Sequence, residues 1–207
     1  SRGGENLFKK PELPYKSMHY YVYILTNKNN TTLYIGITIK SIGNDWVVPS
    51  LKRDFRAGGN DNISLLFDTF NDGTNAFLFG INPYGVRREA LISGGGQDLR
   101  GFTTSWDVKW KGEAVQGENS YTAEMAIPLT SFKFEEGTTK WRFQSYRFDQ
   151  QSNEHSVWYN IPQNQLIFSL AFMGDMVFEK PLGRSRTPLA IIPYINAISE
   201  KDFELDD

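Results

Sequence analysis

Tyr121-Thr122-Ala123-Glu124-Met125-Ala126-Ile127 is the stretch of sequence that decides the fold. Its large apolar side chains fall at every second position, at Tyr121, Met125 and Ile127. The polar residues Thr122 and Glu124 stand between them. Because successive side chains of a strand point to opposite faces, this alternation predicts a β-strand with one face buried and the other in solvent.

The same alternation recurs outward along the chain and predicts further strands at residues 33–39, 63–67 and 108–110. The segments between strands are rich in Asn, Asp and Gly, which bond their own backbone or accept a positive φ and so form hairpin turns. Three connections have this composition: residues 27–30, 71–74 and 116–119. No long window has helical apolar spacing. The sequence therefore predicts an all-β fold, an antiparallel β-sandwich of the jelly-roll type.

The composition is that of one ordinary globular domain. The chain has 207 residues, 40% of them hydrophobic and 22% charged, which favours neither disorder nor a membrane span. Its net charge of −2, with no dense run of Lys and Arg, argues against a nucleic-acid partner. The absence of cysteine excludes disulfides, cysteine-ligated zinc and a thiol nucleophile.

Two parts are predicted along the chain. Residues 1–180 form the sandwich, and residues 181–207 form a linker followed by a tail. The linker prediction rests on the Pro, Gly, Arg and Ser residues between positions 181 and 188. Residues 189–195 are again strand-like and are interpreted as the start of whatever follows the sandwich.

The order of motifs extends the argument beyond single strands. In chain order they are LYIGI at 33–37, LFDTFNDGTNA at 66–76, FGINPYGVRRE at 79–89, YTAEMAIP at 121–128 and IIPY at 191–194. This order resembles the family 9 carbohydrate-binding-like domain found at the start of certain bacterial outer-membrane β-barrel proteins. The resemblance implies a module of the carbohydrate-binding type, without catalytic activity, that binds an oligo- or polysaccharide. It also implies export to the periplasm or outer membrane of a Gram-negative bacterium, and a barrel beginning within residues 181–207.

Tryptophans are the first candidates for sugar contact, because the apolar face of a pyranose stacks on a flat ring. Trp106 follows a Gly-rich segment and Trp158 follows a polar run, so both are predicted to contact ligand. Trp110 and Trp141 fall on the apolar side of alternating strands and are predicted to be core residues.

Polar and aromatic residues near a predicted turn are the second candidates. Tyr84, Arg87 and Arg88 lie around the Asn-Pro-Tyr-Gly segment, and Tyr146 lies on a strand with two arginines. These four side chains are predicted to contact the ligand, with the arginines donating to sugar hydroxyls. A ladder of cross-strand ion pairs, which needs no ligand, is the alternative interpretation.

A possible cation site lies in the stretch 68–75, which concentrates oxygen donors in one turn. Ca²⁺ takes six to eight oxygen ligands from flexible loops. Asp68, Asn71 and Asp72 are the predicted ligands, with Asp61 as an additional one where the strand ends meet. Related modules carry structural calcium, so calcium is the cofactor that the resemblance implies. An Asx-rich hairpin turn without a metal is the alternative.

Catalysis is not predicted, since the chain has no Gly-x-Ser-x-Gly elbow and its carboxylates form no recognisable acid–base pair. Two alternatives to sugar binding stay open. One is a structural plug or docking domain of an outer-membrane barrel. The other is a nuclease, because residues 18–26 (MHYYVYILT) followed by 33–36 (LYIG) resemble the opening hairpin of the GIY-YIG nucleases. That family needs an arginine soon afterwards, where this chain has Gly43, and the nearest arginine is Arg53.

Overall fold

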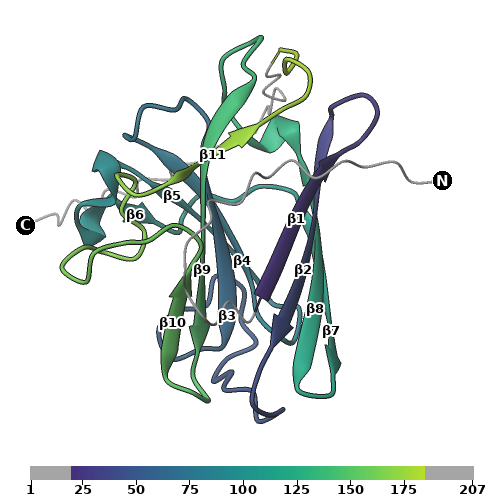
Figure 1. The fold of residues 1–207 in the computed structure, drawn as a ribbon, viewed down its shortest axis with the longest axis vertical. Helices are drawn as coiled ribbons and strands as arrows, with labels where there is room; N and C mark the ends of the chain where they lie inside the picture. The colour runs from purple at the N-terminus through teal and green to yellow at the C-terminus, as the bar shows by residue number, and fades with distance from the viewer. Residues whose placement is uncertain (1–19, 185–207) are drawn as a thin grey trace, which may run out of the picture.

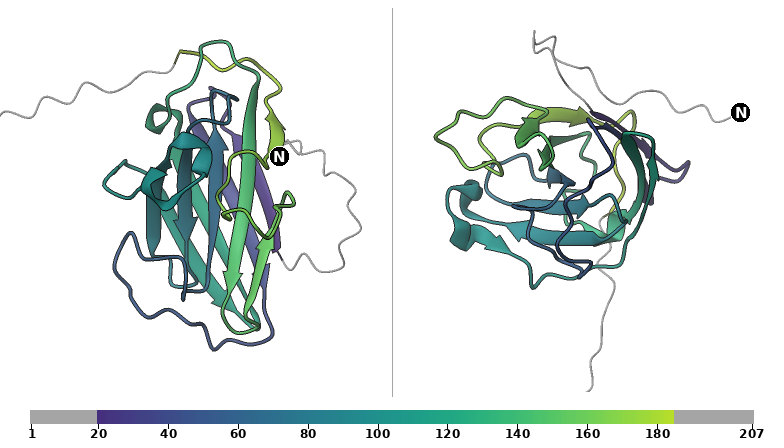
Figure 2. Two further views of the ribbon diagram at one scale, coloured as in Figure 1. Left: turned by 90° about the vertical axis from the view of Figure 1, so that its left-hand side faces the viewer. Right: turned by 90° about the horizontal axis from the view of Figure 1, so that it is seen from below.

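The computed structural model describes residues 20–184 and confirms the predicted antiparallel sandwich. Figures 1 and 2 show its two sheets facing one another. The predicted boundary at position 180 falls near the end of the described residues, and the predicted tail at 189–207, with its IIPY motif, lies outside them. Within residues 20–184, no helix has the length and apolarity needed to cross a membrane.

The smaller sheet has four strands in the order β1-β2-β8-β7. Their bounds are β1 Tyr20–Thr26, β2 Thr32–Lys40, β8 Ser120–Pro128 and β7 Lys111–Gly117. The deciding stretch is the middle of β8, and its residues Tyr121, Met125 and Ile127 are all buried. Pro128 ends this strand and precedes one short 3-10 turn, η3 (Leu129–Ser131).

The larger sheet has seven strands in the order β10-β9-β3-β4-β5-β6, with β11 on the same edge of β9 as β10. Its longer strands are β3 Asn62–Asp68, β4 Ala76–Ile81, β5 Arg87–Ile92 and β9 Lys140–Asp149. Its short ones are β6 Phe102–Thr103, β10 Glu154–Val157 and β11 Gly174–Val177. Two 3-10 turns, η1 (Gly94–Gly96) and η2 (Leu99–Gly101), connect β5 to β6.

The three predicted turns all join antiparallel partners, namely β1 with β2, β3 with β4, and β7 with β8. Asn30, Asn71 and Asn119 each adopt a positive φ in them, as the turn chemistry requires. The prediction of a strand at 108–110 was wrong, because β7 begins only at Lys111. Residues 104–110 instead run without ladder pairing from β6 to β7.

Aromatic rings fill the space between the sheets. Phe67 of β3 contacts Phe143 of β9 at 5.3 Å between ring centroids, and Phe132 at 5.5 Å. Trp141 is fully buried and packs on Phe132 at 5.1 Å. Edge-on and tilted pairs of this kind add about 0.5–1.5 kcal/mol beyond the burial of area. The predicted core roles of Trp141 and of Trp110, which is 4% exposed, are confirmed.

The other face of the seven-stranded sheet is also covered. A second apolar cluster there joins Leu66, Leu78 and Ile92 of the sheet to Phe168 and Leu170 of the segment that follows β10. In Figure 1 this segment lies on the side of the sheet away from the four-stranded sheet. The outer face of the four-stranded sheet carries exposed rings instead. On it, Tyr21, Tyr23 and Tyr34 are 62%, 45% and 47% exposed.

The hairpin that resembles a nuclease opening forms β1 and β2 of the sandwich. Tyr23 is paired with Gly36, and its ring lies across that glycine, since a Cβ at Gly36 would be 1.8 Å from the Tyr23 Cζ. Arg53, the nearest arginine in sequence, is held in an ion pair with Glu89 of the other sheet. The hairpin therefore has a structural role in the sandwich that needs no nuclease chemistry.

Candidate functional site

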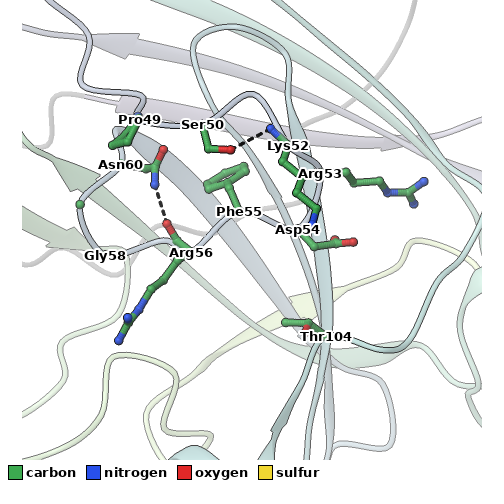
Figure 3. A pocket seen from close by; sticks show the side chains of 11 residues that line it. Pro49, Ser50, Lys52, Arg53, Asp54, Phe55, Arg56, Gly58, Asn60 and Thr104 are labelled. Atoms are coloured by element: carbon green, nitrogen blue, oxygen red, sulfur yellow. Dashed lines mark hydrogen bonds between the residues drawn. The ribbon is translucent and has the colours of Figure 1, made fainter.

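A pocket of about 700 Å³ lies in the long connection between β2 and β3. Residues 49–50, 52–56, 58–60 and Thr104 line it. In Figure 3 the Phe55 ring lies at the centre of these residues, and the side chains of Arg53 and Arg56 leave the loop on opposite sides. The lining combines apolar surface with nitrogen and oxygen donors, which is the character of sites for small polar ligands.

Two carboxylates fix the loop that carries the pocket. Asp61 accepts hydrogen bonds from the backbone N–H of Val47 at 2.6 Å and of Gln150 at 2.7 Å, one on each oxygen. Burial raises the pKa of Asp61, against these two hydrogen bonds, which lower it. Asp54 accepts from the backbone N–H of Glu89, and its own N–H donates to the carbonyl of Arg87. The loop is thus fastened to the edge of β5.

Phe55 seats the loop on the sheet below. Its ring is only 5% exposed and lies over the guanidinium of Arg88, with 5.6 Å from Cζ to the ring centroid. The ring of Phe102 is 5.5 Å from the same Cζ. Phe102 stands two residues before Thr104, another residue of the pocket wall. The Arg88 guanidinium therefore lies between two rings, just behind the pocket.

Gly80 makes room for that arginine. It pairs with Arg88 across β4 and β5, and a Cβ at position 80 would be 2.8 Å from the Arg88 Cγ and 2.8 Å from the Ser64 Oγ. The arginine stem thus crosses the sheet surface toward Ser64. Arg88 is 4% exposed, and its Nη1 is buried with no hydrogen-bond partner among the described residues.

A second arginine closes the side of the sandwich next to the pocket. Arg53 donates to the carboxylate of Glu89, which is fully buried, and to Asp107 at 2.8 Å. Glu89 also accepts from the indole Nε1 of Trp110 at 3.0 Å. Burial raises the pKa of Glu89, while hydrogen bonds from Arg53 and Trp110 oppose the rise. Arg87 donates to the Trp110 carbonyl and lies over its ring, so this network is structural.

The predicted pair of ligand tryptophans does not flank a common cleft. Trp106 is half-buried against Phe77 and Phe79 of β4, at 5.3 and 5.6 Å. Trp158 is half-buried against Phe143 of β9, at 5.5 Å. Strand β3 lies between β4 and β9, and its Phe67 fills the space between the two indoles. The two tryptophans therefore close opposite sides of the same core.

The other predicted contact residues are dispersed. Tyr84 is 53% exposed at the tip of the β4–β5 hairpin, where Asn82 caps the turn by accepting from the N–H of Tyr84 and of Val86. Tyr146 is 1% exposed and belongs to the second apolar cluster, so a ligand has no access to its ring. Of the four residues predicted here, two contact residues of the pocket: the Arg87 carbonyl accepts from the N–H of Asp54, and the Arg88 guanidinium lies against the Phe55 ring. The alternative interpretation, a ladder of cross-strand ion pairs, is met in part: Arg142 of β9 lies 3.9 Å from Asp68 of β3. Neither Arg87 nor Arg88 forms an ion pair within residues 20–184.

The predicted calcium ligands do not form one site. Asp61 and Asp68 stand at opposite ends of β3, which at about 3.3 Å per residue places them roughly 20 Å apart. The two oxygens of Asp68 accept from the N–H of Asn71 and of Gly73, both at 2.8 Å, and the Arg142 Nη1 is 3.9 Å away. Asp72 accepts from its own turn. Within residues 20–184 no group of three or more acidic, His or Cys side chains is placed to hold a metal ion. The Asp68 side chain therefore caps an Asx turn, an arrangement that needs no metal.

Comparison with known proteins identifies the fold. No family model and no curated protein matches the chain. Among solved structures, it is similar to a candidate carbohydrate-binding protein of Bacteroides uniformis, with a TM-score of 0.62 and 15% identity over 85% of this chain and 84% of that one. It is also similar to a family 9 carbohydrate-binding module of Caldicellulosiruptor kristjanssonii in complex with cellotriose, with a TM-score of 0.51 and 12% identity over 86% and 83%.

A structure of a family 9 module from the same organism with glucose gives a TM-score of 0.51 and 14% identity over 82% and 80% of the two chains. The class of protein is therefore defined by its architecture, a β-sandwich of the carbohydrate-binding-module type. In particular, the chain has the fold of the family 9 modules, as its motif order predicted.

Sequence reasoning missed the pocket loop. A signal was present in Lys52-Arg53-Asp54-Phe55-Arg56, where charges surround one aromatic ring between Pro49 and a Gly-Gly pair. Such a run lacks the alternation of a strand, and nothing in it indicates that Phe55 is buried. Its contact with Arg88 joins positions 33 residues apart.

Proposed function

We propose that this chain is a non-catalytic carbohydrate-binding module that takes a saccharide in the pocket formed by residues 49–60 and Thr104. The observation that carries the proposal is the pocket itself, which is open, has a volume of about 700 Å³ and is lined by charged and polar side chains over the buried ring of Phe55. The fold supports it, since two similar structures are family 9 modules in complex with cellotriose and with glucose.

The pocket can be blocked without disturbing the fold. Gly58 lines it, has no positive φ, and a Cβ there meets nothing within 4 Å. Gly58→Trp is therefore expected to fill the pocket with an indole ring. Gly183 has the same open surroundings and lies outside the pocket, so Gly183→Trp is the matched control.

A glycan array followed by titration calorimetry with the best ligand tests the proposal. The unchanged chain and Gly183→Trp are expected to bind with equal affinity, and Gly58→Trp to lose binding at least tenfold. A folded chain that binds no glycan, or a Gly58→Trp variant that binds like the control, would falsify the assignment.

The proposed setting is the cell envelope of a Gram-negative bacterium, with the module exported to the periplasm or outer membrane ahead of a barrel in the same protein. It is supported by the motif resemblance alone. Fractionation of a bacterium that expresses the full gene tests it, with the module expected in the envelope fraction. Recovery in the cytoplasmic fraction would overturn this part of the proposal.

A second candidate function is docking onto that barrel without sugar binding. The exposed tyrosines Tyr21, Tyr23 and Tyr34 favour it, since a bare aromatic sheet face is typical of an interaction surface. In a Tyr21→Ser/Tyr34→Ser variant, the remaining Tyr23 is expected to lose the protection against modification that the barrel gives it in the unchanged chain. Equal modification of these tyrosines with and without the barrel would count against docking.

A further inference from the structure

The pocket carries more positive charge than the chain around it. Its lining includes Lys52, Arg53 and Arg56 and only one carboxylate, Asp54, although the whole chain has a net charge of −2. Arg53 lines the pocket, but its guanidinium is paired with Glu89 and Asp107, neither of which lines it. The exposed pair Lys52 and Arg56 forms no ion pair with any residue in the described part of the chain.

Arg88 adds a buried charge behind this surface. Its guanidinium Cζ lies over the faces of the Phe55 and Phe102 rings, and ring faces stabilise a cation without accepting from its N–H groups. It is 4% exposed, its side chain forms no ion pair within residues 20–184, and its Nη1 is buried there without a hydrogen-bond partner. A buried charge without an acceptor is costly unless a partner arrives.

The chemistry of the missing partner follows from these charges. A neutral hydroxyl accepts a hydrogen bond but leaves the two exposed cations of the lining, Lys52 and Arg56, against the single carboxylate of Asp54, with the charge of Arg88 behind Phe55. A carboxylate supplies a negative charge and two oxygens in one plane, which match the fork of a guanidinium. The low dielectric around Arg88 strengthens that interaction over its value in water.

We propose that the pocket selects acidic saccharides, with a hexuronate carboxylate attracted by the exposed cations of Lys52 and Arg56 and by the charge of Arg88 behind the Phe55 ring. This inference rests on the proposed saccharide-binding function and specifies its ligand class. Lys52 and Arg56 already face solvent, whereas Arg88 lies behind the buried Phe55 ring, which must move before a ligand can contact the guanidinium.

The test compares each acidic oligosaccharide with its own uncharged form. Oligogalacturonate and oligomannuronate of three residues are titrated into the chain beside the same oligosaccharides with their carboxyls reduced to alcohols. At least one acidic form is expected to bind 10- to 100-fold more tightly than its reduced form, with a preference that shrinks as salt is raised. A further titration adds free sulfate as a competitor. If sulfate displaces the acidic oligosaccharide at the same concentration as the uronate, the pocket binds anions in general, and selection of an acidic saccharide is overturned.

Variants assign the preference to these residues. Arg88→Gln is expected to reduce it to less than threefold, while Arg100→Gln, which removes the same charge from an exposed turn outside the pocket, leaves it unchanged. If Arg88→Gln does not fold, Arg88→Lys retains the charge without the fork and is expected to lose part of the preference. The exposed double variant Lys52→Gln/Arg56→Gln is expected to fold and to lose it as well.

The outcomes separate the two proposals. Equal binding of acidic and reduced forms overturns the acidic selection and leaves saccharide binding in place. Binding of neither form, together with no response to any neutral glycan, overturns saccharide binding itself. A preference for the acidic form that survives both Arg88→Gln and Lys52→Gln/Arg56→Gln would show that other residues recognise the carboxylate, and it would overturn the assignment to this pocket.

Discussion

Truncation of Phe55 to alanine is expected to destabilise the whole domain, although Phe55 lies in a loop. The side chain is 95% buried, because only 5% of it is exposed. Burial of about 150 Å² at about 25 cal/mol per Å² corresponds to about 4 kcal/mol, an upper bound because the unfolded chain is already partly collapsed. Alanine retains a small part of this, and the contact with Arg88 contributes about 1 kcal/mol. We expect a loss of about 3 kcal/mol.

Urea unfolding followed by tryptophan fluorescence measures this loss. For a domain of this size it corresponds to a decrease in Tm of about 6–12 °C. Phe70 is the matched control, since it is a loop phenylalanine that is 51% exposed, and Phe70→Ala is expected to cost less than about 1 kcal/mol. Equal losses for the two variants would refute the reasoning, because Phe55 would then hold neither the loop nor the ring contact with Arg88.

Three further predictions concern titration and packing. Because the pKa of Glu89 is raised, its carboxyl binds a proton more tightly in the folded state than in the unfolded state. In urea unfolding, the free-energy advantage of the unchanged chain over Glu89→Gln should therefore shrink as pH rises from about 4 to about 7. An advantage that grows with pH would contradict the raised pKa. Burial raises the pKa of Tyr20 to about 12. Between pH 10 and 12 the free energy of unfolding of the unchanged chain should therefore fall by about 2–3 kcal/mol more than that of Tyr20→Phe. Equal losses in the two proteins would contradict the prediction. Gly36→Ala should displace the Tyr23 ring and cost about 1 kcal/mol in thermal unfolding; a cost that persists in Tyr23→Ser would point to another cause.

Local patterns were sufficient for the strands and turns. The alternation in Tyr121–Ile127 predicted β8 because burial of one sheet face imposes a period of two on any strand at a water interface. Asn30, Asn71 and Asn119 marked turns because few other residues adopt a positive φ at low cost. The prediction failed at 108–110, where two apolar side chains face the core without ladder pairing.

The candidate site depended on contacts that no local pattern contains. Trp106 and Trp158 both follow polar segments, and only the strand order shows that Phe67 separates them. The Asx-rich turn of Asp68 predicted a cation site, and only the backbone geometry shows its oxygens already occupied by N–H groups. In each case the residue type suggested a ligand contact, but in the folded chain the same side chain packs in the core or accepts hydrogen bonds from its own turn.

The sequence by itself determined that this chain is a sandwich of short antiparallel strands, and its motif order indicated the carbohydrate-binding-module fold. Only the tertiary structure located the candidate pocket, because it placed the ring of Phe55 over Arg88 and left the Nη1 of that arginine buried without a hydrogen-bond partner within residues 20–184. The physical reason is that strand formation follows from neighbouring side chains, whereas a binding pocket depends on which distant segments meet and which charges they leave uncompensated.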